Sequence, residues 1–317
     1  MPDSPASLGP HRLALGLAAL GRPAYINLGR EVLPADRTVT AMRAASWAIL
    51  DAAHAAGIRW VDVARSYGLA EEFLAGWLDD RGHEDVVVSS KWGYAYVGEW
   101  RMDAAVHEAK EHSLARFRTQ LAESRKLLGD RITLYQVHSL TADSPLFDDE
   151  ALLEALAELS ASGARVGFST SGPRQAETVR RALQLRVGGQ QVFTAVQSTW
   201  NPLESSVAPA LAEAHDAGAH VLVKEPLANG RLAVDPPTAV AEIAQRHGIG
   251  SDAVALAAAL AQPWADSVLL GPASTGQLRT NLAAVDVRLT VEDLEALGAL
   301  ATDPERYWAE RGALPWI

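Results

Sequence analysis

The feature that most constrains this chain is the alternation of short apolar runs with longer helical patterns along nearly its whole length. The apolar runs are residues 12–18, 58–64, 85–91, 132–138, 164–170, 192–198, 219–225 and 266–271. Each run is apolar or β-branched on both faces, which is typical of buried parallel strands. Ala/Leu/Glu-rich segments with helical spacing separate them, at residues 38–56, 70–80, 113–128, 149–162, 174–185, 206–217, 238–247 and 276–284. Eight strands alternating with eight helices predict an α/β fold, a (β/α)8 TIM barrel.

The alternative for such an alternation is a doubly wound open sheet. A dinucleotide-binding open sheet usually carries a Gly-x-Gly-x-x-Gly turn after its first strand. No such turn follows residues 12–18. The chain also has no low-complexity stretch, internal repeat or evident linker, so we expect one barrel domain over residues 1–317.

Composition narrows the classes of partner. The 317 residues carry a formal net charge of -11 and no cysteine. An acidic chain is a poor partner for nucleic acid or anionic membranes, and a cysteine-free chain has no disulfides or thiolate nucleophiles and fits the reducing cytoplasm. The run "LALGLAALG" (13–21) could pass for a signal-peptide core, but the preceding segment is acidic, so we interpret it as a buried strand and its turn.

Polar residues end several of the predicted strands, where barrel enzymes place their chemistry. Asp62, Lys91 and His138 end the second, third and fourth strands, and Tyr67 follows Asp62 by five residues. A cationic lysine beside a phenol should lower the phenol pKa, and a carboxylate should balance the lysine. Such a set suits general acid catalysis on a carbonyl, or general base catalysis on an alcohol. One His and one Asp are too few ligands for a catalytic zinc, so metal-dependent hydrolysis is disfavoured.

Each of these four residues also has a structural explanation. Asp62 could cap a turn, Tyr67 could be a loop aromatic, Lys91 a solvated strand end and His138 a hydrogen-bonded core residue. Their joint placement at neighbouring strand ends favours the catalytic interpretation.

Six sequence segments carry a resemblance to a known family. They are "GIRWVDVARSYGLAEE" (57–72), "VSSKWG" (88–93), "SRKLLGDRITLYQVHSL" (124–140), "VGFSTSG" (166–172), "AVQSTWNPLE" (195–204) and "LLGPASTGQLRTNLAA" (269–284). In this order they resemble the motifs of the aldo-keto reductase superfamily. The resemblance implies that Asp62, Tyr67, Lys91 and His138 form the catalytic tetrad. Tyr67 would protonate a carbonyl oxygen while a nicotinamide cofactor gives a hydride to the carbon.

The resemblance also implies a cofactor site for NADP(H), with NAD(H) as the alternative. The expected cofactor-binding residues are Ser169, Thr170, Gln197, Trp200, Lys224, Pro226, Leu227, Gly271, Ser274, Gln277 and Asn281. Among them, Trp200 is expected to stack on the nicotinamide and Thr170 to replace the usual Asn. Glu225 stands where the family has a hydroxyl, so we expect it to repel the cofactor pyrophosphate unless Lys224 offsets its charge.

Clustered aromatics predict the wall of a substrate pocket. Trp92, Tyr94 and Trp100 lie within residues 91–102, and Trp308 and Trp316 near the end of the chain could reach the same mouth. Packing onto helices is the alternative for the first group.

The expected substrate is an aldehyde or ketone of modest size, apolar or aromatic. The alternative function is a cofactor-binding redox sensor or partner subunit with slow turnover; the oligomeric state is left open.

Overall fold

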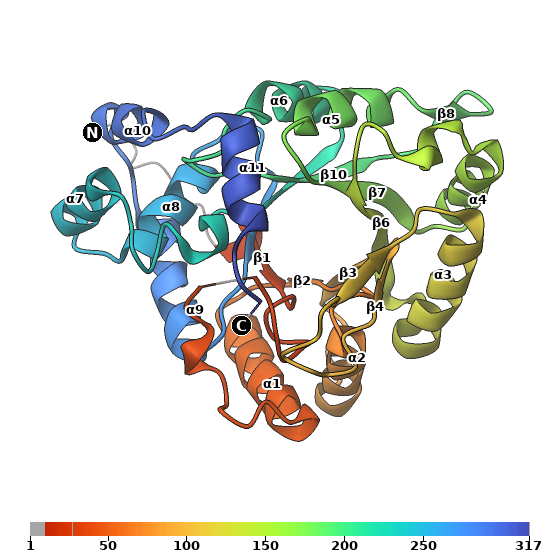
Figure 1. Ribbon diagram of the computed structural model, residues 1–317, viewed down its shortest axis with the longest axis horizontal. Coiled ribbons are helices and arrows are strands. Elements are labelled where there is room, and N and C mark those ends of the chain that lie inside the picture. Colours follow the sequence, from red (N-terminus) through yellow and green to blue (C-terminus); the bar gives the residue numbers. More distant parts are fainter. Residues whose placement is uncertain (1–9, 27, 317) are drawn as a thin grey trace.

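The computed structural model describes residues 10–26 and 28–316, and within them eight parallel strands close into a barrel (Figure 1). The strands follow the ring order β1, β2, β3, β6, β7, β10, β11 and β12, and β12 pairs with β1 to close it. Their bounds are β1 Leu13–Gly16, β2 Trp60–Asp62, β3 Val87–Trp92, β6 Ile132–Leu140, β7 Arg165–Thr170, β10 Ala195–Thr199, β11 His220–Lys224 and β12 Ser267–Leu270. All eight coincide with predicted runs, so the predicted (β/α)8 barrel is confirmed.

Helices surround the barrel on its outside in Figure 1. They are α1 Val39–Ala55, α2 Ala70–Arg81, α3 Leu114–Leu128, α4 Glu150–Ala161, α5 Gln175–Leu183, α6 Ala208–Asp216, α7 Thr238–His247, α8 Ser251–Leu260, α9 Thr275–Leu282, α10 Val291–Gly298 and α11 Pro304–Gly312. Short 3-10 helices are η1 Pro10–Arg12, η2 Arg30–Val32, η3 Gly129–Arg131, η4 Pro145–Asp148, η5 Ala228–Gly230 and η6 Ala283–Asp286. The eight predicted helices are present.

The sequence prediction missed three helices, and each for a different reason. Nearly all of α8 is buried and its sequence is apolar all round, so it lacks the periodicity that marks a surface helix. The α10 helix begins with a capping box between Thr290 and Asp293, and α11 begins at an Asp303 cap followed by Pro304. These caps are sequence signals that could have located both helices.

Two small antiparallel hairpins form sheets separate from the barrel. The strand β4 (Tyr94–Tyr96) pairs with β5 (Glu108–Lys110), and β8 (Arg186–Val187) pairs with β9 (Gln190–Gln191). The β4–β5 hairpin follows β3 directly, so it carries Tyr94 and Glu108 to the C-terminal opening of the barrel. The sequence analysis predicted no strand in this segment.

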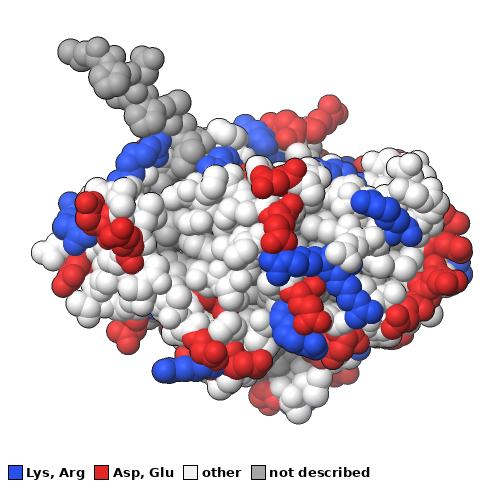
Figure 2. Space-filling view, turned by 90° about the horizontal axis from the view of Figure 1, so that it is seen from above, with Lys and Arg blue, Asp and Glu red and all other residues white. Residues whose placement is uncertain are grey.

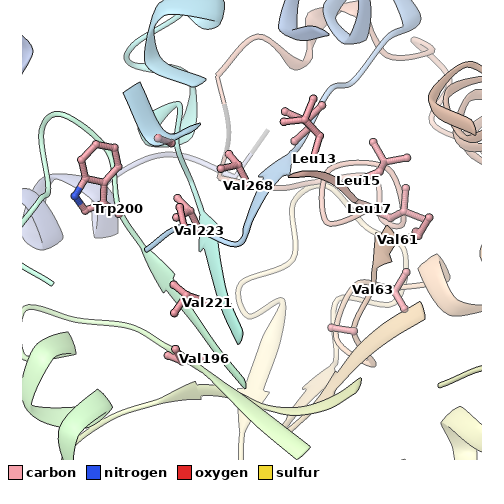
Figure 3. Packing of buried hydrophobic residues seen from close by; sticks show 14 of the residues in the cluster. Leu13, Leu15, Leu17, Val61, Val63, Val196, Trp200, Val221, Val223 and Val268 are labelled. Carbon is pink, nitrogen blue, oxygen red and sulfur yellow. The ribbon is translucent and has the colours of Figure 1, made fainter. Parts of the chain in front are cut away.

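The two faces of the strands have opposite characters. Outward-facing residues such as Val61, Val196 and Val268 pack under the helices in one large apolar cluster (Figure 3). Inside, Leu134, Ala195, Leu222 and Trp60 form a small apolar cluster. Two residues further along these strands, on the same face, stand Gln136, Gln197, Lys224 and Asp62. The barrel interior therefore turns polar towards its C-terminal opening.

The surface carries both signs of charge. Acidic and basic side chains are interspersed over the face in Figure 2, which looks down on the top edge of Figure 1. Arg180 of α5 and Glu213 of α6, for example, form an ion pair of 2.7 Å. Among the described helices, none is long and apolar enough to cross a membrane.

Candidate active site

The four predicted catalytic residues meet at the C-terminal opening of the barrel. Lys91 on β3 donates through Nζ to Asp62 at the end of β2, to the Val63 carbonyl oxygen at 3.0 Å and to Tyr67 Oη at 3.2 Å. The ring of His138, on β6, meets the Tyr67 ring edge-on, with centroids 5.4 Å apart. The expected proximity of phenol, ammonium, carboxylate and imidazole is therefore present.

Asp62 is held by a network that offsets the cost of burying its charge. Besides the Lys91 ammonium, Oδ1 accepts hydrogen bonds from Ser89 Oγ at 2.6 Å, Gln136 Nε2 at 3.2 Å and Gln197 Nε2 at 3.3 Å. Its side chain is 3% exposed and that of Lys91 is fully buried. This pair lies beneath the phenol and fixes the position of the ammonium.

The electrostatics of the phenol differ from the sequence expectation. Burial and the charge of Asp62 raise the pKa of Tyr67 well above its ordinary value. The sequence led us to expect a lowered pKa; the pKa is raised instead, because burial disfavours the charged phenolate and the charge of Asp62 adds to this effect. Burial, together with the charges of Lys91 and Lys224, lowers the pKa of His138 well below its ordinary value. Around neutral pH the site therefore holds a protonated phenol and a neutral imidazole.

Two glycines set the turn that carries Tyr67. A Cβ on Gly21 would lie 2.2 Å from the Tyr67 carbonyl oxygen, and one on Gly68 would lie 2.4 Å from the Gly21 carbonyl oxygen. Gly68 also has φ of 60°, a conformation that favours glycine. Leu69 N donates to the Gly21 carbonyl oxygen at 2.7 Å. The turn after β1 thus packs directly against the Tyr67 turn.

The substitution Gly21→Ala is therefore expected to displace the Tyr67 backbone. We expect a loss of about 1–3 kcal/mol in the free energy of unfolding and a loss of any activity that depends on the position of Tyr67. Urea titration and steady-state kinetics would measure both effects. Gly298→Ala is the matched control, because a Cβ there meets no atom within 4 Å; equal stabilities of the two variants would contradict the argument.

A cavity of about 300 Å³ opens above the four residues. Of the predicted site residues, it is lined by Asp62, Tyr67, His138, Tyr94, Gln197, Lys224, Pro226, Leu227 and Gly271. Lys91 lies just below it, in contact with Tyr67. Half of the predicted set therefore converges on one cavity.

Two tryptophans predicted in the substrate wall lie elsewhere. Because Lys91 faces the barrel interior, its neighbour Trp92 faces outwards and is buried against Phe117 of α3, with ring centroids 5.1 Å apart. Trp100 donates through Nε1 to the Arg37 carbonyl oxygen at 2.8 Å and packs towards Phe73. The pocket-wall prediction is wrong for both. The alternative, packing against helices, is correct for Trp92, and Trp100 likewise packs towards Phe73 of α2.

Two predicted cofactor contacts are also corrected. Trp200 lies in the apolar cluster outside the barrel (Figure 3), where its ring meets Trp264 at 5.8 Å. It does not line the cavity, so it cannot stack on a ring held there. Thr170 is buried, and its Oγ1 is engaged by Ser198 Oγ at 2.7 Å and Gln175 Oε1 at 3.0 Å. The strand phase that turns Ser169 inwards turns Thr170 outwards.

The remaining predicted cofactor residues lie outside the cavity wall. Ser169 Oγ accepts from Ser139 N at 2.8 Å. On α9, Ser274 caps the helix, Gln277 Nε2 donates to the Gly29 carbonyl oxygen at 2.8 Å, and Asn281 Nδ2 donates to Asp252 at 2.7 Å. Their roles in binding a cofactor stay predictions.

Several cavity residues were not predicted as site residues. Arg22, Tyr25, Glu108, Asn229 and Arg311 all contribute to its wall. Arg22 and Tyr25 come from one turn, where the guanidinium lies 4.5 Å from the Tyr25 ring centroid, and the other three come from segments far away in sequence. No sequence pattern marked these residues as part of a site.

The C-terminal segment forms one side of the cavity, as expected for Trp316. The Trp316 ring stacks on His107 at 4.3 Å, and the Arg22 guanidinium lies 4.9 Å from its centroid. Figure 1 shows this end of the chain over the barrel opening. Trp308, by contrast, packs beside Tyr307 and does not line the cavity.

Glu225 has a partner that the sequence did not reveal. Arg311 of α11 contacts both its carboxylate oxygens, with the Nε–Oε2 distance 2.8 Å, and Thr199 Oγ1 donates to Oε2 at 3.2 Å. Although burial alone would favour the protonated form, Arg311 and Lys224 lower the pKa of Glu225 to about 2. The carboxylate is thus charged but neutralised, and the expected repulsion of a phosphate is largely removed.

The polar groups of the cavity fit a nicotinamide cofactor. Asn229 Oδ1 is buried at the cavity wall with no hydrogen-bond partner among the described residues. Such an acceptor is costly unless a donor reaches it, and a carboxamide or an adenine amine supplies one. Gln197 and Gly271 line the same cavity.

Comparison with known proteins indicates one protein family. The sequence model of the aldo/keto reductase family matches residues 13–302. Aldo-keto reductase str7 of Strobilurus tenacellus is 26% identical over 292 residues, covering 81% of each chain. The uncharacterized oxidoreductase YqkF of Bacillus subtilis is 28% identical over 285 residues, covering 78% of this chain and 85% of its own. The solved aldo-keto reductase AKR11C1 from Bacillus halodurans (holo form) shares the fold, with a TM-score of 0.65, 23% identity and 92% of each chain covered.

Proposed function

This chain belongs to the aldo/keto reductase family, and from that premise we propose that it reduces an aldehyde or ketone to an alcohol, reversibly, with NADP(H). NAD(H) is the alternative cofactor. The 3.2 Å contact between Lys91 Nζ and Tyr67 Oη carries the proposal, because it places a proton donor and a cation at the floor of the cavity. A bound nicotinamide supplies the hydride for this reaction.

In the proposed mechanism Tyr67 is the general acid. A substrate carbonyl oxygen between Tyr67 and His138 accepts the phenolic proton as negative charge develops on it. Lys91, within hydrogen-bond distance of the phenol, stabilises the phenolate that results, and Asp62 holds the ammonium in place. The neutral imidazole of His138 orients the carbonyl by donating a hydrogen bond. Oxidation of the alcohol reverses each proton movement.

We propose that Gln197, Asn229, Pro226, Leu227 and Gly271 hold the cofactor, because they line the cavity together with Tyr67. Ser169, Ser274, Gln277 and Asn281 would extend that site beyond the cavity. None of these nine residues is an arginine that could pair with a ribose 2'-phosphate, which is why NAD(H) is the alternative. Fluorescence titration with both cofactors decides between them; equal affinities would contradict an NADP(H) preference.

A panel of aldehydes and ketones tests the function directly. Protein, carbonyl compound and NADPH or NADH are mixed, and absorbance at 340 nm is followed. A fall in this absorbance supports reductase activity. Flat traces across the panel, with cofactor binding confirmed by fluorescence, would instead support the slow-turnover sensor or partner subunit.

The pKa directions predict a flat pH profile for reduction. The raised pKa of Tyr67 keeps the phenol protonated up to high pH, and the lowered pKa of His138 keeps the imidazole neutral down to low pH. At saturating substrate, kcat is expected to stay constant between about pH 6 and pH 9. It should decline only outside that window, as Tyr67 loses or His138 gains a proton. A fall of kcat centred near pH 7 would show that the phenol is acidic after all.

A further inference from the structure

The cationic side chains at the cavity outnumber the carboxylates. Three carboxylates each have a dedicated cation: Asp62 pairs with Lys91, Glu108 with Arg22 at 2.8 Å, and Glu225 with Arg311. These pairs account for every carboxylate among the described residues that line the cavity. A fourth cation, Lys224, lines the same cavity.

Lys224 has hydrogen-bonding capacity left over. Its Nζ donates to Thr199 Oγ1 at 2.8 Å and lies 3.7 Å from Glu225 Oε1, an oxygen that Arg311 already contacts. The side chain is 15% exposed. An ammonium has three donors, and burying it without a full complement of acceptors is unfavourable. Burial is the main reason that the pKa of Lys224 is lowered to about 8, with Arg311 and Lys91 adding to the effect against the opposing charge of Glu225.

The position of Lys224 ties it to the reacting end of the cavity. It stands at the end of β11, level with Thr199 on β10. Its charge is one of those that depress the pKa of His138, and it in turn feels the charge of Lys91. Lys224 also lines the same cavity as Tyr67 and His138, so a group bound at Lys224 would share that cavity with the carbonyl that these two residues address.

We propose that Lys224 binds a carboxylate of the substrate, so that the preferred substrates are aldehydes or ketones that also carry a carboxylate. The inference rests on the proposed reductase function and narrows its substrate class. It replaces the expectation of a purely apolar substrate. The aromatic rings of Tyr25, Tyr94 and Trp316, which line the same cavity, suit the body of such a molecule.

Matched substrates test this assignment. The specificity constants kcat/KM for 4-carboxybenzaldehyde and for its neutral methyl ester are measured with one cofactor. The wild-type protein is expected to prefer the acid by about 10-fold to 100-fold, the range of a charge-assisted hydrogen bond. In Lys224→Met this ratio should fall close to one, while Lys224→Arg should keep most of it. Lys126→Met, at an exposed position on α3, is the control that should leave the ratio unchanged.

The outcomes separate the possible sources of the anion. Loss of the ratio in Lys224→Met with an unchanged cofactor dissociation constant supports the substrate carboxylate. A weakened cofactor dissociation constant with the ratio intact would assign Lys224 to a cofactor phosphate and overturn the proposal. An absent preference in the wild type also overturns it, although turnover of the neutral ester would leave the reductase function standing. If neither compound is reduced and the wider panel is also inert, the reductase function itself fails.

Discussion

Replacing Tyr67 by phenylalanine is expected to lower kcat for carbonyl reduction by about 10²-fold to 10⁴-fold, the usual contribution of a positioned proton donor. The change removes only the hydroxyl that Lys91 Nζ contacts at 3.2 Å. The ring contacts with His138 and Arg22 can remain, so the barrel should fold normally. The loss should therefore appear in kcat and not in cofactor affinity, as measured at 340 nm and by fluorescence titration.

Tyr94→Phe is the matched control for this experiment. Tyr94 also lines the cavity, and burial raises its pKa to about 12, but its hydroxyl has no contact with Lys91 among the described hydrogen bonds. Its removal should change kcat far less. Similar losses in the two variants would contradict the assignment of Tyr67 as the proton donor.

The second large effect concerns stability. Lys91→Met leaves the carboxylate of Asp62 buried without its cation, and we expect a loss of about 3–5 kcal/mol in the free energy of unfolding. The double variant Asp62→Asn, Lys91→Met removes both charges, and the asparagine can keep hydrogen bonds with Ser89 and the two glutamines. The double variant should therefore recover much of the lost stability.

Denaturant titration of the wild type, both single variants and the double variant measures the coupling between the two charges. Lys126→Met on the exposed face of α3 controls for the loss of a lysine as such. Additive effects of the two single changes would show that Asp62 and Lys91 do not act as a pair. The double variant should remain without reductase activity even where its stability returns.

The barrel and the catalytic residues at the floor of the cavity could be predicted from local sequence. Strand and helix periods can be recognised within about ten residues. The sequence places Asp62 and Lys91 at adjacent strand ends and Tyr67 in the turn that follows Asp62. The orientation of Trp92 could also have been deduced, since a residue beside an inward-facing lysine must face outwards. By the same rule, Thr170 faces outwards because its neighbour Ser169 faces inwards. These errors arose from reading residue types without the phase of the strand.

The cavity walls could not be predicted in this way. Glu225 and Arg311 are 86 positions apart, as are Arg22 and Glu108. Nothing near either carboxylate in the sequence indicates which cation neutralises it, and that partner decides whether the wall repels or accepts an anion. The surplus charge of Lys224 becomes visible only after all of these pairs are known.

The closure between β1 and β12 affects how the protein folds and how readily it aggregates. Leu13 pairs with Val268, so strands from opposite ends of the chain complete the ring. Until they meet, both expose unpaired backbone groups that can recruit a neighbouring molecule. Such long-range pairing is slow, so aggregation during refolding should depend on protein concentration; once closed, the ring offers no open edge for another strand to join.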